Sequence, residues 1–237
     1  MKLRREHQPE EMDRLEADTG ELTRSLVDLK VVNRWLGGRR TAVSLILGLA
    51  KGIPGDIVRV LDVGTGGADI PVALVRGARA RGIALQVTAT DLHPKTLAYA
   101  ARLAAGETEI EVEEADARDL PYADDAFDLV SANTVLHHFS REDAALVLRE
   151  MARVGRYGMV VTDLSRSRLA LAGARLLAAT VWRRHPITRH DGPTSVRAAF
   201  TPAELQSLAA ECLTGRWMVR RHVFFRLSLT LERARSQ

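Results

Sequence analysis

The stretch from Arg59 to Ile70 reads Arg-Val-Leu-Asp-Val-Gly-Thr-Gly-Gly-Ala-Asp-Ile and constrains the fold more than any other part of the 237-residue chain. The apolar run around Asp62 predicts a buried strand over residues 58–63. Three glycines follow this strand at once: Gly64, Gly66 and Gly67. Glycine allows positive φ and lets a ligand approach the backbone closely. Because helical spacing resumes at Ile70, the stretch predicts a helix N-terminus, whose unpaired N–H groups can face a polar ligand.

Strand and helix patterns alternate after this turn. Apolar and β-branched runs predict five strands, at 58–63, 85–91, 109–114, 127–132 and 157–163. Apolar residues three and four apart predict helices at 69–81, 94–105 and 141–153. This alternation is typical of a parallel sheet with helices on both faces. Since ligands bind such folds beyond the carboxyl ends of the strands, we expect the functional site at the loops that follow these five strands.

The two ends of the chain follow other patterns. Residues 1–20 are charged and predict a mobile tail or a short helix, and the helices on either side of Gly37 and Gly38 predict an N-terminal helical lid over 1–55. An Ala/Leu/Arg pattern predicts one long helix over 165–184, within a substrate-cap insertion at 165–200 of the main domain, 56–237. A helix then starts at Thr201. The last two strands are expected near 216–221 and 223–231.

Composition narrows the function classes. The net charge is +4, but the arginines are spread along the chain, which argues against a nucleic-acid partner. The single cysteine, Cys212, excludes an internal disulfide and favours a cytoplasmic protein. The charged start from Met1 to His7 has no apolar run behind it, so we expect no secretory signal. No apolar run reaches the roughly 18–20 residues that span a bilayer.

The glycine turn departs from both common phosphate-binding patterns. The dinucleotide pattern G-x-G-x-x-G needs a third glycine where this chain has Asp69, and the lysine of a P-loop is missing. Acidic residues lie instead at three successive strand ends: Asp62, Asp91 and Asp116. Carboxylates suit hydroxyl groups, an amino group or a positively charged ligand better than they suit a pyrophosphate.

Four segments resemble, in order and spacing, the motifs of class I S-adenosylmethionine-dependent methyltransferases: Val60–Gly66, Thr88–Leu92, Glu114–Tyr122 and Phe127–Phe139. The resemblance covers residues 58–165. It implies a Rossmann-like, seven-stranded, mostly parallel sheet with an antiparallel last strand, and S-adenosyl-L-methionine as the cofactor. Ala68 stands where the family usually has a third glycine, so we expect slightly altered packing there rather than lost binding.

The same resemblance implies which residues bind the cofactor: Asp62, Gly64, Thr65, Gly66, Asp91, Leu92, Asp116, Ala117 and Asn133. The glycine turn is expected to line the methionine part, with Asp62 supporting its amino group and Asn133 near its amino-acid end. Asp91 is expected to bind both ribose hydroxyls, with Leu92 on the adenine, and Asp116 to accept from the adenine amino group. Two alternatives stay open, because Asp91 can instead cap a helix and Asp116 can be an ordinary loop acid.

Two polar clusters are the candidates for catalysis. His137 and His138 follow the fourth predicted strand, where a histidine can serve as general base, although one can instead cap a helix while the other packs. The second cluster comprises His185, His190, Asp191, Ser195 and Arg197. His190 or Arg197 is expected to meet an anionic or phenolic oxygen, or else the cluster holds a lid by salt bridges. The histidine spacing fits no zinc pattern, so no metal is expected.

Weaker resemblances concern the acceptor. The segment Val32–Arg40 is similar in character to a segment of quinone-biosynthesis C-methyltransferases, and the layout around His185–Gly192 resembles bacterial methyltransferases associated with type III polyketide synthases. They imply methylation of a small aromatic, phenolic or polyketide-like molecule. Methylation of an oxygen atom is the first hypothesis, and methylation of a carbon atom is the alternative. An RNA or DNA amine methyltransferase is disfavoured by Ser131–Val135, which lacks the expected Pro-Pro-aromatic motif. A non-catalytic cofactor-binding protein is a third reading, and a monomer and a homodimer both stay open.

Overall fold

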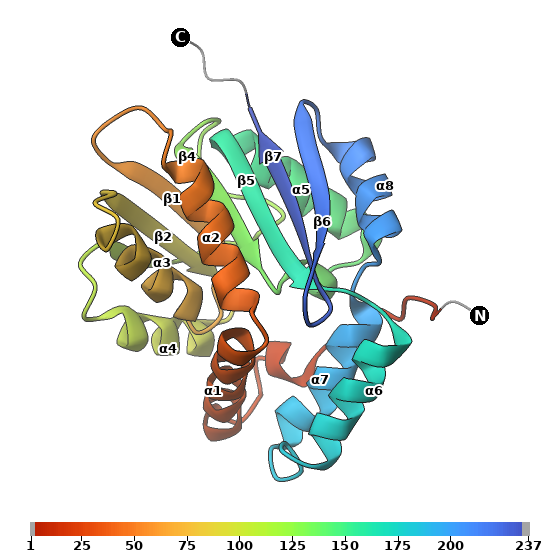
Figure 1. Ribbon diagram of the computed structural model, residues 1–237. Helices are drawn as coiled ribbons and strands as arrows, with labels where there is room; N and C mark the ends of the chain where they lie inside the picture. The colour runs from red at the N-terminus through yellow and green to blue at the C-terminus, as the bar shows by residue number, and fades with distance from the viewer. Residues whose placement is uncertain (1–2, 234–237) are drawn as a thin grey trace.

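The computed structural model describes residues 3–233, whose strands form one seven-stranded sheet in the order β3-β2-β1-β4-β5-β7-β6 (Figure 1). The strands are β1 (Val58–Val63), β2 (Leu85–Asp91), β3 (Ile110–Glu114), β4 (Phe127–Asn133), β5 (Gly155–Leu164), β6 (Arg216–His222) and β7 (Arg226–Glu232). Strands β1 to β5 pair in parallel, and β7 runs antiparallel to both β5 and β6. The predicted Rossmann-like, mostly parallel sheet with an antiparallel last strand is confirmed.

Helices cover both faces of this sheet. One face carries α2 (Gly38–Ala50) and α3 (Asp69–Arg79), with α4 (Pro94–Ala104) next to α3, and the other carries α5 (Arg141–Val154) and α8 (Pro202–Cys212). Neighbouring residues of a strand point to opposite faces. Val60 therefore packs in the core under α2 and α3, while Leu61 packs in the core under α5 and α8. Strand β1 is thus buried from both sides, which explains why four of its six residues are apolar.

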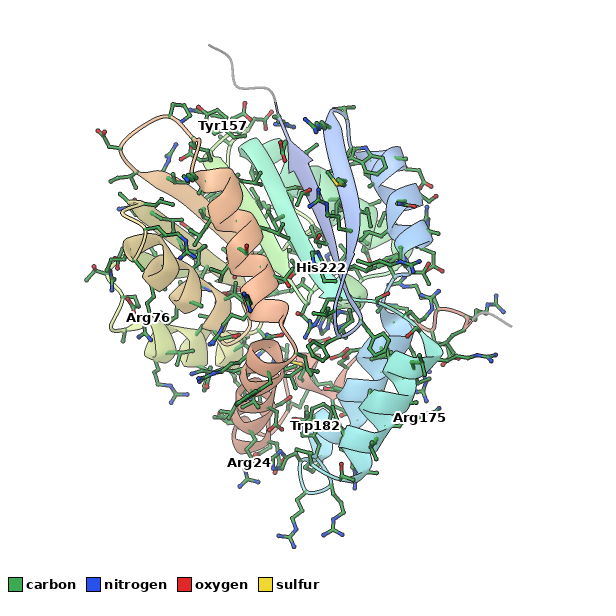
Figure 2. All side chains as sticks on the ribbon, viewed as in Figure 1. Arg24, Arg76, Tyr157, Arg175, Trp182 and His222 are labelled. Carbon is green, nitrogen blue, oxygen red and sulfur yellow. The ribbon has the colours of Figure 1, made fainter. Side chains whose placement is uncertain are left out.

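Three further helices lie beyond the carboxyl ends of the parallel strands: α1 (Thr19–Trp35), α6 (Arg168–Ala179) and α7 (Pro186–Ala198) (Figure 1). Figure 2 shows Trp182, from the turn after α6, near α1 and α7. A Cβ at Gly192 of α7 would lie 2.8 Å from this indole ring, so a glycine there lets the ring pack against the helix. Arg24 and Arg175 point away from this helical layer into solvent (Figure 2). No helix of residues 3–233 is long and apolar enough to cross a membrane.

The N-terminal segment packs against the helical layer and contains a short helix, so of the two alternatives predicted for residues 1–20 the short helix is the one present within residues 3–18. Arg5 donates hydrogen bonds to the carbonyl oxygens of Ala198 and Phe139. Farther along, the short 3-10 helix η1 (Glu11–Asp13) begins where the backbone N–H groups of Glu11 and Met12 donate to the carboxylate of Asp191. These contacts bring the N-terminal segment to the carboxyl edge of the sheet.

Two predicted elements differ from the structure. The helix predicted over 165–184 ends at Ala179, and the polar segment after it is a second helix, α7, rather than a loop. Helix α7 accepts Pro193 in its interior, at a cost of about 3 kcal/mol, because it packs along the length of α6. The last strand begins at Arg226 instead of residue 223, since Phe224 and Phe225 adopt positive φ values of 55° and 56° in the preceding turn.

Candidate functional site

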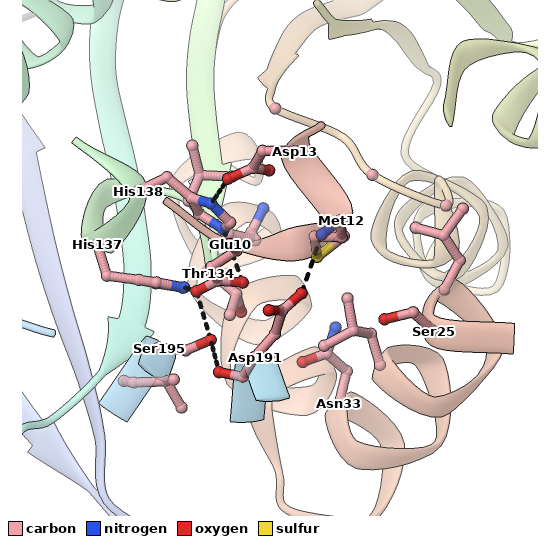
Figure 3. A pocket seen from close by; sticks show the side chains of 18 of the residues that line it. Glu10, Met12, Asp13, Ser25, Asn33, Thr134, His137, His138, Asp191 and Ser195 are labelled. Carbon is pink, nitrogen blue, oxygen red and sulfur yellow. Dashed lines mark hydrogen bonds and ion pairs between the residues drawn. The ribbon is translucent and has the colours of Figure 1, made fainter. Parts of the chain in front are cut away.

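A cavity of about 1080 Å³ lies between the carboxyl ends of the strands and the layer of α1, α6 and α7. Figure 3 shows the polar side chains of its wall, which come from the N-terminal segment, α1, α7 and the loop after β4. Ligand pockets are typically about 300–1000 Å³, so this cavity has room for a nucleoside cofactor together with a small acceptor. The predicted residues that line it are Asp62, Gly64, Thr65, Gly66, Asp91, Leu92, Asp116, Ala117, Asn133, His137 and His138.

Asp62 is fixed in the floor of the cavity by three side-chain donors. The hydroxyls of Thr65 and Ser131 donate at 2.9 Å and 2.6 Å, and the amide nitrogen of Asn133 donates at 2.9 Å. Burial raises the pKa of Asp62 to about 6 in spite of these hydrogen bonds. A positive charge placed in the cavity therefore favours the ionised form of this carboxyl group.

The glycine turn presents open backbone to the same cavity. Gly64 and Gly66 have positive φ values of 64° and 54°, and a Cβ at Gly66 would meet no atom within 4 Å. At Gly64 a Cβ would instead lie 2.6 Å from Val135, so that position needs glycine for its packing. Ala68 replaces the third glycine and is buried with φ at 56°, a conformation that costs an L-residue about 1–2 kcal/mol.

Asp91 closes the glycine turn at the end of β2. Its Oδ2 accepts the backbone N–H of Gly66 at 2.9 Å, and its Oδ1 accepts the backbone N–H of His93 at 3.0 Å. The alternative that Asp91 caps a helix is wrong, because the N-cap of α4 is His93. Each oxygen of Asp91 keeps a lone pair, so the carboxylate can still accept from two hydroxyl groups. Next to it, Leu92 leaves 53% of its surface exposed on the cavity wall, where a flat ring can pack.

The carboxylate of Asp116 already binds the side chain of Arg118, which would compete with a ligand for it. The guanidinium of Arg118 donates to both carboxylate oxygens, the shorter contact being 2.7 Å, and these hydrogen bonds lower the pKa of Asp116. Ala117 is buried beside it on the cavity wall. Asp116 is therefore ionised and oriented, but a ligand amino group has to share the carboxylate with Arg118.

His137 is enclosed between two carboxylates. Its backbone N–H and its Nδ1 both contact Asp163, at 2.9 Å and 2.7 Å, and its Nε2 lies 3.4 Å from Oε1 of Glu10. Only 1% of its side chain is exposed. Because both ring nitrogens already face carboxylates, His137 acts in the structure as a support for Glu10 and the loop after β4.

His138 has the more open position of the pair. Its Nδ1 lies 2.8 Å from Oδ2 of Asp13, its Nε2 lies 4.0 Å from Oε2 of Glu10, and 20% of its side chain is exposed. Burial alone would lower the pKa of His138, but the negative charges of Glu10 and Asp13 outweigh it and raise the pKa to about 10. Burial would likewise raise the pKa of Glu10, yet the two histidines bring it to about 2.

Glu10, His137 and His138 also meet the minimal geometry of a metal site, since one ligand atom of each lies within 4.8 Å of the others. Hydrogen bonds already occupy these side chains, because Ser195 donates to Glu10 at 2.6 Å while the two Nδ1 atoms contact aspartates. The expectation that no metal binds stays a prediction, and among residues 3–233 these three are the group that could hold one.

Only some residues of the second predicted cluster, at 185–197, line the cavity. His190 points outward with 49% of its side chain exposed, and Arg197 lies near Glu6 of the N-terminal segment, at 3.9 Å. Neither lines the cavity, because α7 is a helix and turns these two positions away from it. Asp191 and Ser195, one helical turn apart, are the members of the cluster that face the cavity (Figure 3).

The sequence patterns did not predict two other residues of the site, Glu10 and Asp13. Glu10 and Asp13 come from the segment read as a tail, and only their contacts with the two histidines place them in the site. Asp163, near the end of β5, is buried next to His137. Arg166 donates to the carbonyl oxygen of Ala199 and does not line the cavity.

Comparisons with known proteins agree with this geometry. Residues 60–158 match a family described as "Methyltransferase domain". A solved SAM-dependent methyltransferase from Aquifex aeolicus is 16% identical with a TM-score of 0.61, covering 90% of this chain and 97% of that one. Human N-acetylserotonin methyltransferase in complex with SAM is 14% identical with a TM-score of 0.66, covering 92% and 57%. The CMeT domain of the citrinin polyketide synthase is 13% identical with a TM-score of 0.62, covering 81% and 52%. The chain thus spans little more than half of these last two structures.

The matched segment runs from β1 into β5 and contains the glycine turn and the acids at the three strand ends. These residues suit S-adenosylmethionine, because open backbone at Gly66 and ionisable groups at Asp62 and Asp91 face one cavity. Residues 60–158 thus match a methyltransferase domain, and the chain shares the fold of solved S-adenosylmethionine-dependent methyltransferases.

Proposed function

We propose that this chain is an S-adenosylmethionine-dependent methyltransferase that acts on a small aromatic, phenolic or polyketide-like molecule and methylates an oxygen atom. The observation that carries the proposal is the position of His138, which lines the same cavity as Asp91 and the glycine turn. An acceptor oxygen bound between them is close to a proton-accepting group and to the donor at the same time. Apolar side chains such as Leu26, Ala174 and Trp182 line the remaining wall and suit an aromatic or aliphatic acceptor.

The cofactor supplies a methyl group on a positively charged sulfur, and the chain's own residues have two tasks. Asp91, Asp62 and the glycine turn hold the donor in place, and alignment of this kind can supply effective molarities of about 10⁵–10⁸ M. His138 takes the proton of the acceptor hydroxyl when its ring is neutral. A pKa of about 10 makes this transfer nearly balanced for a phenol, whose pKa is also about 10.

His137, His190 and Arg197 receive different roles in this proposal. His137 holds Glu10 in position, and the other two fix α7 and the N-terminal segment without touching the acceptor. The segment Val32–Arg40 keeps its resemblance to quinone-biosynthesis enzymes, and the citrinin domain is described as a CMeT domain, so methylation of a carbon atom is the second candidate. A cytoplasmic location stays a prediction that rests on the single cysteine.

The direct test is incubation with S-adenosylmethionine and a panel of phenols, quinols and alkylpyrones. We expect release of S-adenosylhomocysteine, and the chemical shift of the new methyl group in NMR spectra separates an O-methyl from a C-methyl product. Release with none of these acceptors, in a protein that binds the cofactor, would favour the non-catalytic reading. Retention on RNA that falls steeply with salt would favour the nucleic-acid reading.

A further inference from the structure

Arg226 is a buried cation without a partner anion. It opens β7, exposes only 2% of its surface and lines the cavity. Its two terminal nitrogens donate to neutral oxygens, that of the Thr134 hydroxyl at 3.1 Å and that of the Asn33 amide at 3.2 Å. Its Nε has no hydrogen-bond partner, and within residues 3–233 no carboxylate lies at ion-pair distance, so Asp163 and Asp69 act on its charge only from farther away. Since an unpaired buried charge is costly, this arrangement points to a missing anion.

Asp69 is a buried carboxylate in the same cavity, and one of its oxygens lacks a hydrogen-bond donor. It begins α3 directly after the glycine turn, and only 9% of its surface is exposed. Its Oδ2 is buried and has no hydrogen-bond partner. Asp62, by contrast, already accepts three hydrogen bonds. Asp69 thus has one buried oxygen without a donor, and this oxygen points to a missing cation.

Asn33 of α1 joins the two unsatisfied groups. Its amide oxygen accepts from Arg226, and its side chain also lies near Asp69, where it opposes the rise that burial causes in the pKa of that carboxyl group. Gly38 makes room for this bridge, because a Cβ there would lie 3.1 Å from Cζ of Arg226 and 3.2 Å from Oδ1 of Asn33. Figure 3 shows Asn33 and Thr134 in the wall of the cavity. A positive and a negative group are therefore held on either side of one neutral amide.

From this arrangement we propose that Asp69, Asn33 and Arg226 form a subsite for a zwitterionic α-amino acid group. Asp69 binds the ammonium group, and Arg226 binds the carboxylate with the help of Thr134. The inference rests on the assignment of S-adenosylmethionine to this cavity, whose methionine end is such a zwitterion. It differs from the sequence-based expectation, in which Asp62 and the region of Asn133 met the amino-acid end.

Calorimetry with three ligands tests each contact separately. The ligands are S-adenosylhomocysteine, its decarboxylated analogue and its deaminated analogue. In Arg226→Met the affinity for S-adenosylhomocysteine should fall about 10- to 100-fold, while the affinity for the decarboxylated analogue should stay within about threefold of wild type. In Asp69→Asn the affinity for S-adenosylhomocysteine should fall, while the affinity for the deaminated analogue should stay close to that of the wild type. Arg221→Met, on the exposed side of β6, is the matched control and should bind all three ligands as wild type does.

The proposal would be overturned if a variant lost the same affinity for S-adenosylhomocysteine as for the analogue that lacks the contacted group. It would also be overturned if the variant lost affinity for neither ligand. Arg226→Lys keeps the charge and the buried stem, and should recover part of the selectivity for the carboxylate. Its failure to distinguish S-adenosylhomocysteine from the decarboxylated analogue would contradict the subsite even if Arg226→Met does not fold. The proposed acceptor chemistry is tested independently, because wild-type turnover with phenols does not depend on which residue holds the amino-acid end.

Discussion

Glu10 Oε1 lies 3.4 Å from Nε2 of His137, which joins the N-terminal segment to the loop after β4. The same carboxylate accepts a hydrogen bond from Ser195 of α7 and lies 4.0 Å from Nε2 of His138. One side chain thus ties three parts of the fold together at the cavity. Its charge also sets the proton affinity of His138, so Glu10 is a positioning residue with a predictable effect on the reaction.

Replacing Glu10 by Gln should change the pH profile of the reaction. The main charge that raises the pKa of His138 is removed, so the ring becomes neutral at lower pH but is also a weaker base. We expect the plateau of kcat/KM to begin at lower pH and to be about 10-fold lower, with unchanged affinity for S-adenosylhomocysteine. Glu11→Gln is the control, because that side chain pairs with Arg14 at the surface. An unshifted profile in Glu10→Gln would contradict the role of Glu10.

His138→Gln should lower kcat by about 100-fold or more, since a positioned general base contributes about 10²–10⁴. In the wild type, kcat/KM for a phenol should rise about tenfold per pH unit towards pH 10, because only the neutral ring accepts a proton and its pKa is about 10. Steady-state kinetics from about pH 7 to 10 measure both effects. His190→Gln, outside the cavity, should behave as wild type. A pH-independent rate in the wild type would exclude His138 as the base.

Cofactor binding should depend on the ionisation of Asp62. Its raised pKa of about 6 means that the group is protonated below this pH and ionised above it. A positively charged ligand prefers the ionised form, so the affinity for S-adenosylmethionine should increase as the pH rises through 6 and then level off. Asp62→Asn should reduce this pH dependence in calorimetry between about pH 5 and 7.5, and the part that remains belongs to Asp69 and Asp91, whose pKa values burial also raises. Asp116→Asn should keep the curve, because the pKa of Asp116 is lowered and its charge does not change in this range.

Chelation should leave the enzyme intact. Glu10, His137 and His138 are each engaged in hydrogen bonds or ion pairs that need no metal. After dialysis against EDTA we expect the same turnover and the same melting temperature as before. A loss of activity that zinc or another divalent ion restores would show instead that these three residues are metal ligands.

The sequence is informative where local pattern decides the structure. The strand at 58–63, the positive φ of its glycine turn and the position of Asp91 at a strand end all follow from residues close together in the chain. Parallel strands bring their carboxyl ends to one edge, so the place of the site could be predicted before its geometry was known.

Other parts of the site depend on contacts between distant segments. Glu10 and Asp13 lie in a charged stretch without periodicity, and their place is set by His137 and His138, far along the chain. Arg226 was expected only as one residue of a final strand, whereas its importance comes from a buried Nε that has no hydrogen-bond partner among the described residues. The helix α7 was missed because Pro193 and Gly192 interrupt the pattern, and packing against α6 overrides these local preferences.

The electron density of S-adenosylhomocysteine bound to the crystalline protein is the most direct test of the central claim, that one cavity holds the donor and His138 together. We predict the ribose hydroxyls on the carboxylate of Asp91, the amino-acid end between Asp69 and Arg226, and the sulfur open towards His138. A ribose placed away from Asp91, or a sulfur separated from His138 by a wall of the protein, would contradict the account.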